Sequence, residues 1–140
     1  MINIALLGCN GKMGQVIARL LSEDEEAKVS FGFDIKTERK NSFPVYSDIS
    51  DIKESADVVL DFSNPASLGS ITEYCISKNV PAVIATTGLS SDQISDIDNL
   101  SKKVAVFRSA NMSVGINLLI NLVKKAAAVL DGKFDIEIVE

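Results

Sequence analysis

Three glycines at three-residue intervals, Gly8, Gly11 and Gly14, mark the segment with the most specific chemistry in the sequence. A G-x-x-G-x-x-G segment is a variant of the dinucleotide-binding fingerprint. The first glycine permits a tight turn, the second lets the backbone approach a pyrophosphate, and the third allows a helix to pack closely on a sheet. The plain alternative is a loop that needs glycine to start a helix. Because the segment lies between an expected strand and an expected helix, nucleotide binding is the favoured interpretation.

An acidic residue, Asp34, follows the next β-prone stretch and lies 26 residues after Gly8. In dinucleotide-binding folds an acid at this place accepts hydrogen bonds from the adenosine ribose, whereas an ordinary surface aspartate is the alternative. A carboxylate here repels a 2′-phosphate, so NAD is possible. Lys12 and Lys36 could offset that repulsion and admit NADP. Either could instead be a solvated surface lysine, which is the better interpretation of Lys36.

Three further polar segments follow expected strands, and ligands of parallel sheets bind beyond the carboxyl ends of the strands. Threonine hydroxyls and the Asn111 amide could hold the carboxamide of a nicotinamide ring, although Thr-Thr-Gly alone is only a polar turn. Asp61 could cap the following helix rather than contact a ligand. The three segments are Asp61-Phe62-Ser63, Thr86-Thr87-Gly88 and Ser109-Ala110-Asn111-Met112.

The elements that must position these segments alternate in type along the chain. Apolar β-prone stretches predict strands, and amphipathic spacing with capping residues predicts helices, whereas 35–46 is expected to be a loop and 48–55 a short helix. Such alternation implies right-handed βαβ crossovers, so we expect an α/β fold with a doubly wound parallel sheet. The expected strands are 1–7, 29–33, 57–62, 80–85 and 104–107, and the expected helices are 12–22, 64–77, 91–102 and 113–130.

Composition excludes several classes of protein. The 140 residues are the size of one domain, and the net charge of −5 argues against a nucleic-acid partner. Apolar runs are too short for a membrane span and the N-terminus lacks a basic leader, so a cytoplasmic protein is expected. The absence of histidine excludes Ser-His and Cys-His catalysis and histidine-ligated metals in this sequence.

The two cysteines are too few for a disulfide scaffold or a thiolate zinc site, so no metal is expected. Cys9 is expected to pack as a small residue in the glycine loop. The alternative is a redox thiol, because a helix N-terminus lowers a thiol pKa. Cys75 is expected to be a buried helix residue.

Together these segments resemble the 4-hydroxy-tetrahydrodipicolinate reductase family, also called dihydrodipicolinate reductase, of bacterial and plant lysine biosynthesis. They span nearly the whole chain in the family's order, and the last is the most specific. The matching segments are Gly8-Cys9-Asn10-Gly11-Lys12-Met13-Gly14, Asp61-Phe62-Ser63, Ala85-Thr86-Thr87-Gly88 and Ser109-Ala110-Asn111-Met112-Ser113-Val114-Gly115-Ile116-Asn117.

The resemblance implies a Rossmann-like NAD(P)-binding domain of an oxidoreductase of diaminopimelate and lysine biosynthesis. That family reduces a cyclic dicarboxylate with NADH or NADPH. Ile35 stands where the family often has a basic residue, which leaves the choice between NADH and NADPH open, and Ala85 stands where glycine is common. The cofactor-binding residues implied are Gly8, Cys9, Asn10, Gly11, Lys12, Met13, Asp34, Phe62, Ala85, Thr86, Thr87, Ser109, Ala110, Asn111 and Met112.

By the same resemblance, residues 1–133 form the dinucleotide-binding domain, and 134–140 form the first strand of a substrate and oligomerisation domain. The family's His-His pair and lysine would lie beyond Glu140, so we expect no catalytic residue in this chain and no turnover by it alone. A homotetramer is expected only with the missing domain. The alternatives are a stand-alone NAD(P)-binding or sensor module and another Rossmann oxidoreductase, such as a homoserine or semialdehyde dehydrogenase. The segment 109–117 argues against the latter.

Overall fold

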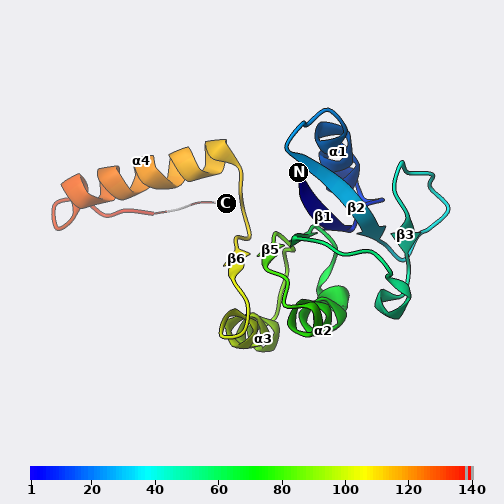
Figure 1. Cartoon of the computed structure of the whole chain (residues 1–140). Coiled ribbons are helices and arrows are strands. Elements are labelled where there is room, and N and C mark those ends of the chain that lie inside the picture. The colour runs from blue at the N-terminus through cyan, green and yellow to red at the C-terminus, as the bar shows by residue number, and fades with distance from the viewer. Residues whose placement is uncertain (138, 140) are drawn as a thin grey trace. The chain divides into compact units, whose positions relative to one another are not determined.

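Six strands form one sheet in the order β3-β2-β1-β4-β5-β6, and each strand runs parallel to its neighbours (Figure 1). The computed structural model describes residues 1–137 and 139, which divide into two units, 1–110 and 111–140. The predicted doubly wound parallel sheet is confirmed. The strands are β1 (Ile2–Leu7), β2 (Ala27–Phe33), β3 (Val45–Tyr46), β4 (Val58–Asp61), β5 (Ala82–Ile84) and β6 (Val106–Arg108).

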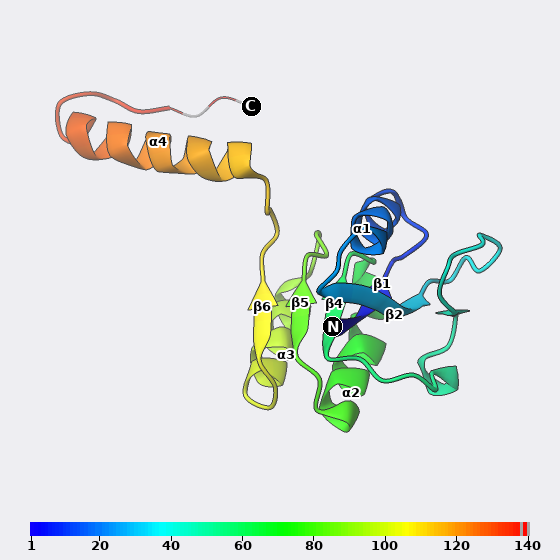
Figure 2. The same ribbon diagram turned by 45° about the horizontal axis from the view of Figure 1, so that its top comes forward.

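The helices of the first unit cover both faces of this sheet. α1 (Lys12–Ser22) lies against β1 and β2 on one face, while α2 (Leu68–Lys78) and α3 (Ser91–Ser101) lie on the other (Figure 1). β5 and β6 run side by side in the same direction, with α3 beside them (Figure 2). This arrangement is the three-layer form that buries a parallel sheet on both sides.

Alternation along β1 supplies apolar side chains to both layers. Ala5 and Leu7 join the core that α2 and α3 cover, whereas Ile4 and Leu6 point to the opposite face because successive strand residues alternate. Phe31 lies in the same core as Ala5 and makes edge-on ring contacts. Its centroid lies 6.3 Å from the ring of Tyr46 and 6.0 Å from that of Tyr74.

Three helix starts have the capping residues that the sequence predicts. The Ser90 hydroxyl accepts the Gln93 N–H at 3.2 Å, and the Gln93 side chain accepts the Ser90 N–H at 3.0 Å, so a complete capping box begins α3. Asn64 accepts the N–H of Ala66 at 2.9 Å, but it begins a 3₁₀ turn (Pro65–Ser67) that leads into α2. Ser113 caps α4 (Val114–Leu130) in the second unit.

Two expectations for the region between β2 and β4 need correction. The expected loop 35–46 contains β3, which pairs with β2 through only two residues, too few to produce a sequence pattern. The expected short helix at 48–55 is a single 3₁₀ turn (Ile49–Asp51), which Asp48 caps by accepting the Ser50 N–H at 2.8 Å and which ends where Ile52 becomes extended.

The second unit consists of α4 and the residues after it. The strand expected over 134–140 is not formed by 134–137 or by 139, and Ile138 and Glu140 lie outside the described residues. A strand requires a neighbouring strand to accept and donate its backbone hydrogen bonds, and these residues have no such pairing. Within the described chain, no helix is long and apolar enough to cross a membrane.

Close backbone approach fixes the start of α1. A Cβ on Gly14 would lie 2.1 Å from the carbonyl oxygen of Gly8 and 2.7 Å from the Cα of Cys9. Both neighbours are backbone atoms, so a side chain at position 14 would force α1 away from the turn. Gly14 therefore allows α1 to lie close to the turn after β1, and the close packing found here is against this turn rather than against the strands.

Both cysteines are fully buried, Cys9 beside the glycine turn and Cys75 in α2. Burial raises the pKa of the Cys9 thiol to about 11, and the nearby Asp34 charge adds to the rise. Burial also raises the pKa of Cys75 to about 11, with a smaller contribution from Asp61. These thiols stay protonated at neutral pH, so the packing role is supported over the redox role.

We expect Gly14→Ala to lower the free energy of unfolding by more than about 2 kcal/mol, because the added methyl group overlaps backbone. Gly69→Ala is the matched control, since a Cβ on Gly69 in α2 meets nothing within 4 Å. That variant should be unchanged or more stable by up to about 1 kcal/mol. Urea unfolding followed by circular dichroism measures both. Equal stability of the two variants would contradict the close approach at Gly14.

We expect both thiols to react slowly with a disulfide reagent such as DTNB at pH 8 in the folded protein. A pKa raised from 9.0 to about 11 lowers the thiolate fraction about hundredfold at a given pH, and burial slows access further. Labelling should become fast in urea. Cys75→Ala leaves Cys9 as the one reporter. Fast labelling of that variant in its folded state would support the redox role of Cys9 instead.

Candidate functional site

A cleft of about 230 Å³ opens at the carboxyl ends of three neighbouring strands, β1, β2 and β4. This is the edge at which ligands of doubly wound sheets bind, next to the point where the strand order reverses. The residues that line the cleft are Gly8, Asn10, Gly11, Phe33, Asp34, Ile35, Lys36, Phe62, Ser63, Asn64 and Ser67.

The glycine turn after β1 passes between the ends of β2 and β4. The N–H of Gly8 donates to the carbonyl of Phe33 at 2.8 Å, and the N–H of Phe62 donates to the carbonyl of Leu7 at 3.0 Å. Gly8 has φ +73°, and a Cβ there would lie 2.5 Å from the carbonyl oxygen of Phe62. Glycine is required both by the backbone conformation and by this contact.

The N-terminus of α1 opens at this turn. Its N-cap is Gly11, so no side chain caps the first turn, and none of the residues in that turn is acidic. The first N–H groups of a helix lack partners within the helix and carry positive partial charge, which makes such an end suited to a phosphate. Lys12 and Met13 are exposed in this turn but do not line the cleft.

Asp34 lies opposite the glycine turn, and backbone donors orient its carboxylate. Oδ2 accepts the N–H of Asn10 and Oδ1 accepts the N–H of Lys36, both at 3.0 Å. A carboxylate offers about four acceptor positions, so two remain for ligand hydroxyls. Lys36 lines the same cleft, which places this lysine closer to the expected ribose than the sequence indicated.

Asp61 at the end of β4 is a structural residue. Its side chain is 1% exposed and accepts the N–H of Ser63 at 2.9 Å, the Ser63 hydroxyl at 2.5 Å and the Thr86 hydroxyl at 2.8 Å. The Thr86 side chain is itself buried. The hydroxyl expected to serve a nicotinamide ring therefore donates to Asp61, which ties the end of β4 to the end of β5.

Other residues expected in the site lie outside the cleft. The ends of β5 and β6 place Ala85, Thr87, Ser109 and Ala110 along the same edge of the sheet. Asn111 and Met112 belong to the second unit, and their roles stay predictions. Cys9 does not line this cleft, because its buried side chain packs against Gly32 of β2. Only its backbone could approach a ligand.

Sequence reasoning missed part of the cleft lining. Phe33, Asn64 and Ser67 line it but were not expected in the site, whereas Ser63 was expected only as part of the polar segment after β4. Position beyond a strand end, which marked Ser63, was also the available signal for Asn64. The described residues form no group of three or more histidine, cysteine or carboxylate side chains that could hold a metal.

Known proteins are similar to this chain in sequence and in fold. Residues 2–112 match the family described as "Dihydrodipicolinate reductase, N-terminus". The 4-hydroxy-tetrahydrodipicolinate reductases of Caldanaerobacter subterraneus subsp. tengcongensis and Clostridium tetani are 51% and 41% identical over 140 residues. That is 100% of this chain and 55% of each relative, so the chain spans about half the length of the relatives that it matches.

A solved structure agrees with these relatives. The dipicolinate-bound dihydrodipicolinate reductase from Paenisporosarcina sp. TG-14 superposes with a TM-score of 0.76 at 26% identity, covering 91% of this chain and 54% of that one. The comparisons by sequence and by fold thus point to the same family. The chain belongs to the dihydrodipicolinate reductase family, with residues 2–112 corresponding to the family's N-terminal part.

Proposed function

We propose that this chain is the NAD(P)H-binding part of a 4-hydroxy-tetrahydrodipicolinate reductase. The observation that carries the proposal is the cleft in which the glycine turn, the uncapped start of α1 and the Asp34 carboxylate meet. In a dinucleotide site the glycine turn and the helix start bind the pyrophosphate, and an acidic residue at the end of the second strand binds the ribose. Family membership supports the same cofactor class.

The pyrophosphate would lie over the start of α1. Its negative charge would be stabilised by the free N–H groups of the first turn, with the exposed Lys12 nearby. The ribose hydroxyls would donate to the two open acceptor positions of Asp34. The exposed side chain of Ile35 provides apolar surface beside that carboxylate for the adenine ring.

The nicotinamide half would lie toward the ends of β5 and β6. Backbone groups of Ala85 and the exposed Thr87 are its proposed contacts there, together with the segment Ser109-Ala110-Asn111-Met112. Thr86 would act through Asp61, by holding the end of β5 in place. When bound, NAD(P)H supplies a hydride, and the residues of this chain bind and orient the cofactor that carries it.

The remaining steps of the reaction belong to the half of the relatives that this chain does not span. A dicarboxylate substrate is supported by the dipicolinate bound in the structural relative. The groups that hold and protonate this substrate, and the contacts of a homotetramer, are proposed to lie in that other half. We place the reaction in cytoplasmic diaminopimelate and lysine biosynthesis. On this division of labour, the 140 residues bind cofactor but do not turn over substrate.

We expect the 140-residue protein to bind NADH or NADPH with a dissociation constant below about 1 mM, since the groups proposed to hold the pyrophosphate and the ribose are all in this chain. Isothermal titration calorimetry with each nucleotide measures this directly. Absence of heat with both nucleotides at millimolar concentration would overturn the proposal. Reduction of substrate by this chain alone would contradict the division of labour.

We expect Asp34→Ala to raise the dissociation constant for NADH about tenfold to hundredfold, because a hydrogen bond to a charged group contributes about 1.5–3 kcal/mol. Asp98→Ala is the matched control, since Asp98 is an exposed aspartate on α3. Calorimetry on both variants, with circular dichroism to verify folding, makes the comparison. An unchanged affinity of the folded Asp34→Ala variant would remove Asp34 from the ribose site.

A further inference from the structure

Three side-chain amides, those of Asn10, Gln15 and Asn41, bond to one another in a row that we call the amide relay. Gln15 Nε2 in α1 donates to Asn41 Oδ1 at 3.0 Å, and Asn41 Nδ2 donates to Asn10 Oδ1 at 2.9 Å. Gln15 Nε2 also donates to the carbonyl of Cys9 at 2.8 Å. The relay therefore joins the first helix, the loop before β3 and the glycine turn.

The relay ends on the residues that orient Asp34. Asn10 Nδ2 donates to the carbonyl of Lys36, while the backbone N–H groups of Asn10 and Lys36 donate to opposite oxygens of Asp34. Asn10, Asp34 and Lys36 thus close a ring of hydrogen bonds. Because both donors of the carboxylate are held by one side chain, the orientation of Asp34 depends on the position of Asn10.

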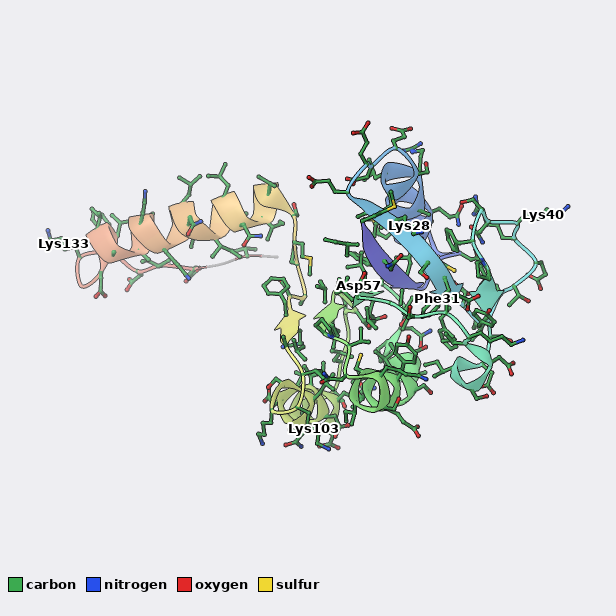
Figure 3. All side chains as sticks on the ribbon, viewed as in Figure 1. Lys28, Phe31, Lys40, Asp57, Lys103 and Lys133 are labelled. Atoms are coloured by element: carbon green, nitrogen blue, oxygen red, sulfur yellow. The ribbon has the colours of Figure 1, made fainter. Side chains whose placement is uncertain are left out.

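Asn41 is the connection between this ring and a basic loop. Besides Asn10, its amide donates to the carbonyl of Arg39 at 3.2 Å. The loop carries three exposed cations, Lys36, Arg39 and Lys40, and the Lys40 side chain points away from the protein (Figure 3). Asn41 therefore restrains the segment that could bring positive charge to a 2′-phosphate at Asp34.

We propose that the amide relay is a positioning device that sets Asp34 to accept the hydroxyls of an adenosine ribose, and so favours NADH over NADPH. This inference rests on the proposed function. A carboxylate held by two fixed donors keeps its repulsion of a 2′-phosphate, because it cannot turn away. Without the relay, Asp34 can rotate and the loop cations can approach the phosphate.

The test compares the dissociation constants for NADH and NADPH of the wild-type chain, Asn41→Ala and Asn41→Asp by calorimetry. Asn41→Asp keeps the acceptor for Gln15 but removes the donor to Asn10 at equal size. Both variants should weaken NADH about tenfold and NADPH by less than about threefold, so that the preference for NADH falls. Asn99→Ala is the control, since Asn99 lies on α3 and its side chain bonds to Lys102.

Tryptic cleavage in the loop gives a second measurement. Cleavage after Lys36, Arg39 and Lys40 should be faster in both Asn41 variants than in Asn99→Ala, which would support release of the loop. An unchanged ratio of the two dissociation constants in the folded Asn41 variants would overturn the inference, even if both affinities fall. Failure of the wild-type chain to bind either nucleotide would overturn the proposed function, and this inference with it.

Discussion

The contact between the turn after β1 and the end of β4 is the constraint on which the site depends. Gly8 has a left-handed backbone conformation, and its N–H donates to the carbonyl of Phe33 at the end of β2. On the opposite side, the carbonyl of Phe62 occupies the position that a Cβ of residue 8 would need. Since the turn is confined between these two strand ends, α1 must begin at the cleft. The same turn places the N–H of Asn10 where it donates a hydrogen bond to the Asp34 carboxylate.

Two carboxylates at this edge of the sheet, those of Asp34 and Asp61, differ in how accessible their hydrogen-bond acceptor positions are to a ligand. Asp61 is buried and receives three donors, two from Ser63 that hold the turn after β4 and one from Thr86 that joins β4 to β5. Asp34 is half-buried and accepts hydrogen bonds from two backbone N–H groups, so its carboxylate is oriented but can still accept hydrogen bonds from a ligand. The same chemical group thus serves structure at one strand end and is available to a ligand at the next.

Local patterns were sufficient to predict much of this from sequence. The predicted bounds of α1, 12–22, agree at both ends, because its apolar residues recur at helical spacing in the sequence. The capping box at Ser90 likewise depends only on spacing. β3 was missed because two residues carry no pattern. Thr86 was assigned to a ligand because its hydrogen bond to Asp61, 25 residues away in the sequence, leaves no local pattern. The bond between Asn10 and Asn41, 31 residues apart, was missed for the same reason. Such pairings arise only when distant elements pack.

The side chain of Cys9 fills the space beside Gly32, between β2 and the glycine turn. A Cβ on Gly32 would lie 2.5 Å from the Cys9 sulfur and 2.9 Å from the ring of Phe43, so position 32 has no room for a side chain while position 9 is cysteine. The two positions therefore depend on each other in one direction: a side chain at position 32 is compatible with this packing only where position 9 carries a residue smaller than cysteine. Descendants of this sequence would exchange the pair in a set order, with the smaller side chain arriving first.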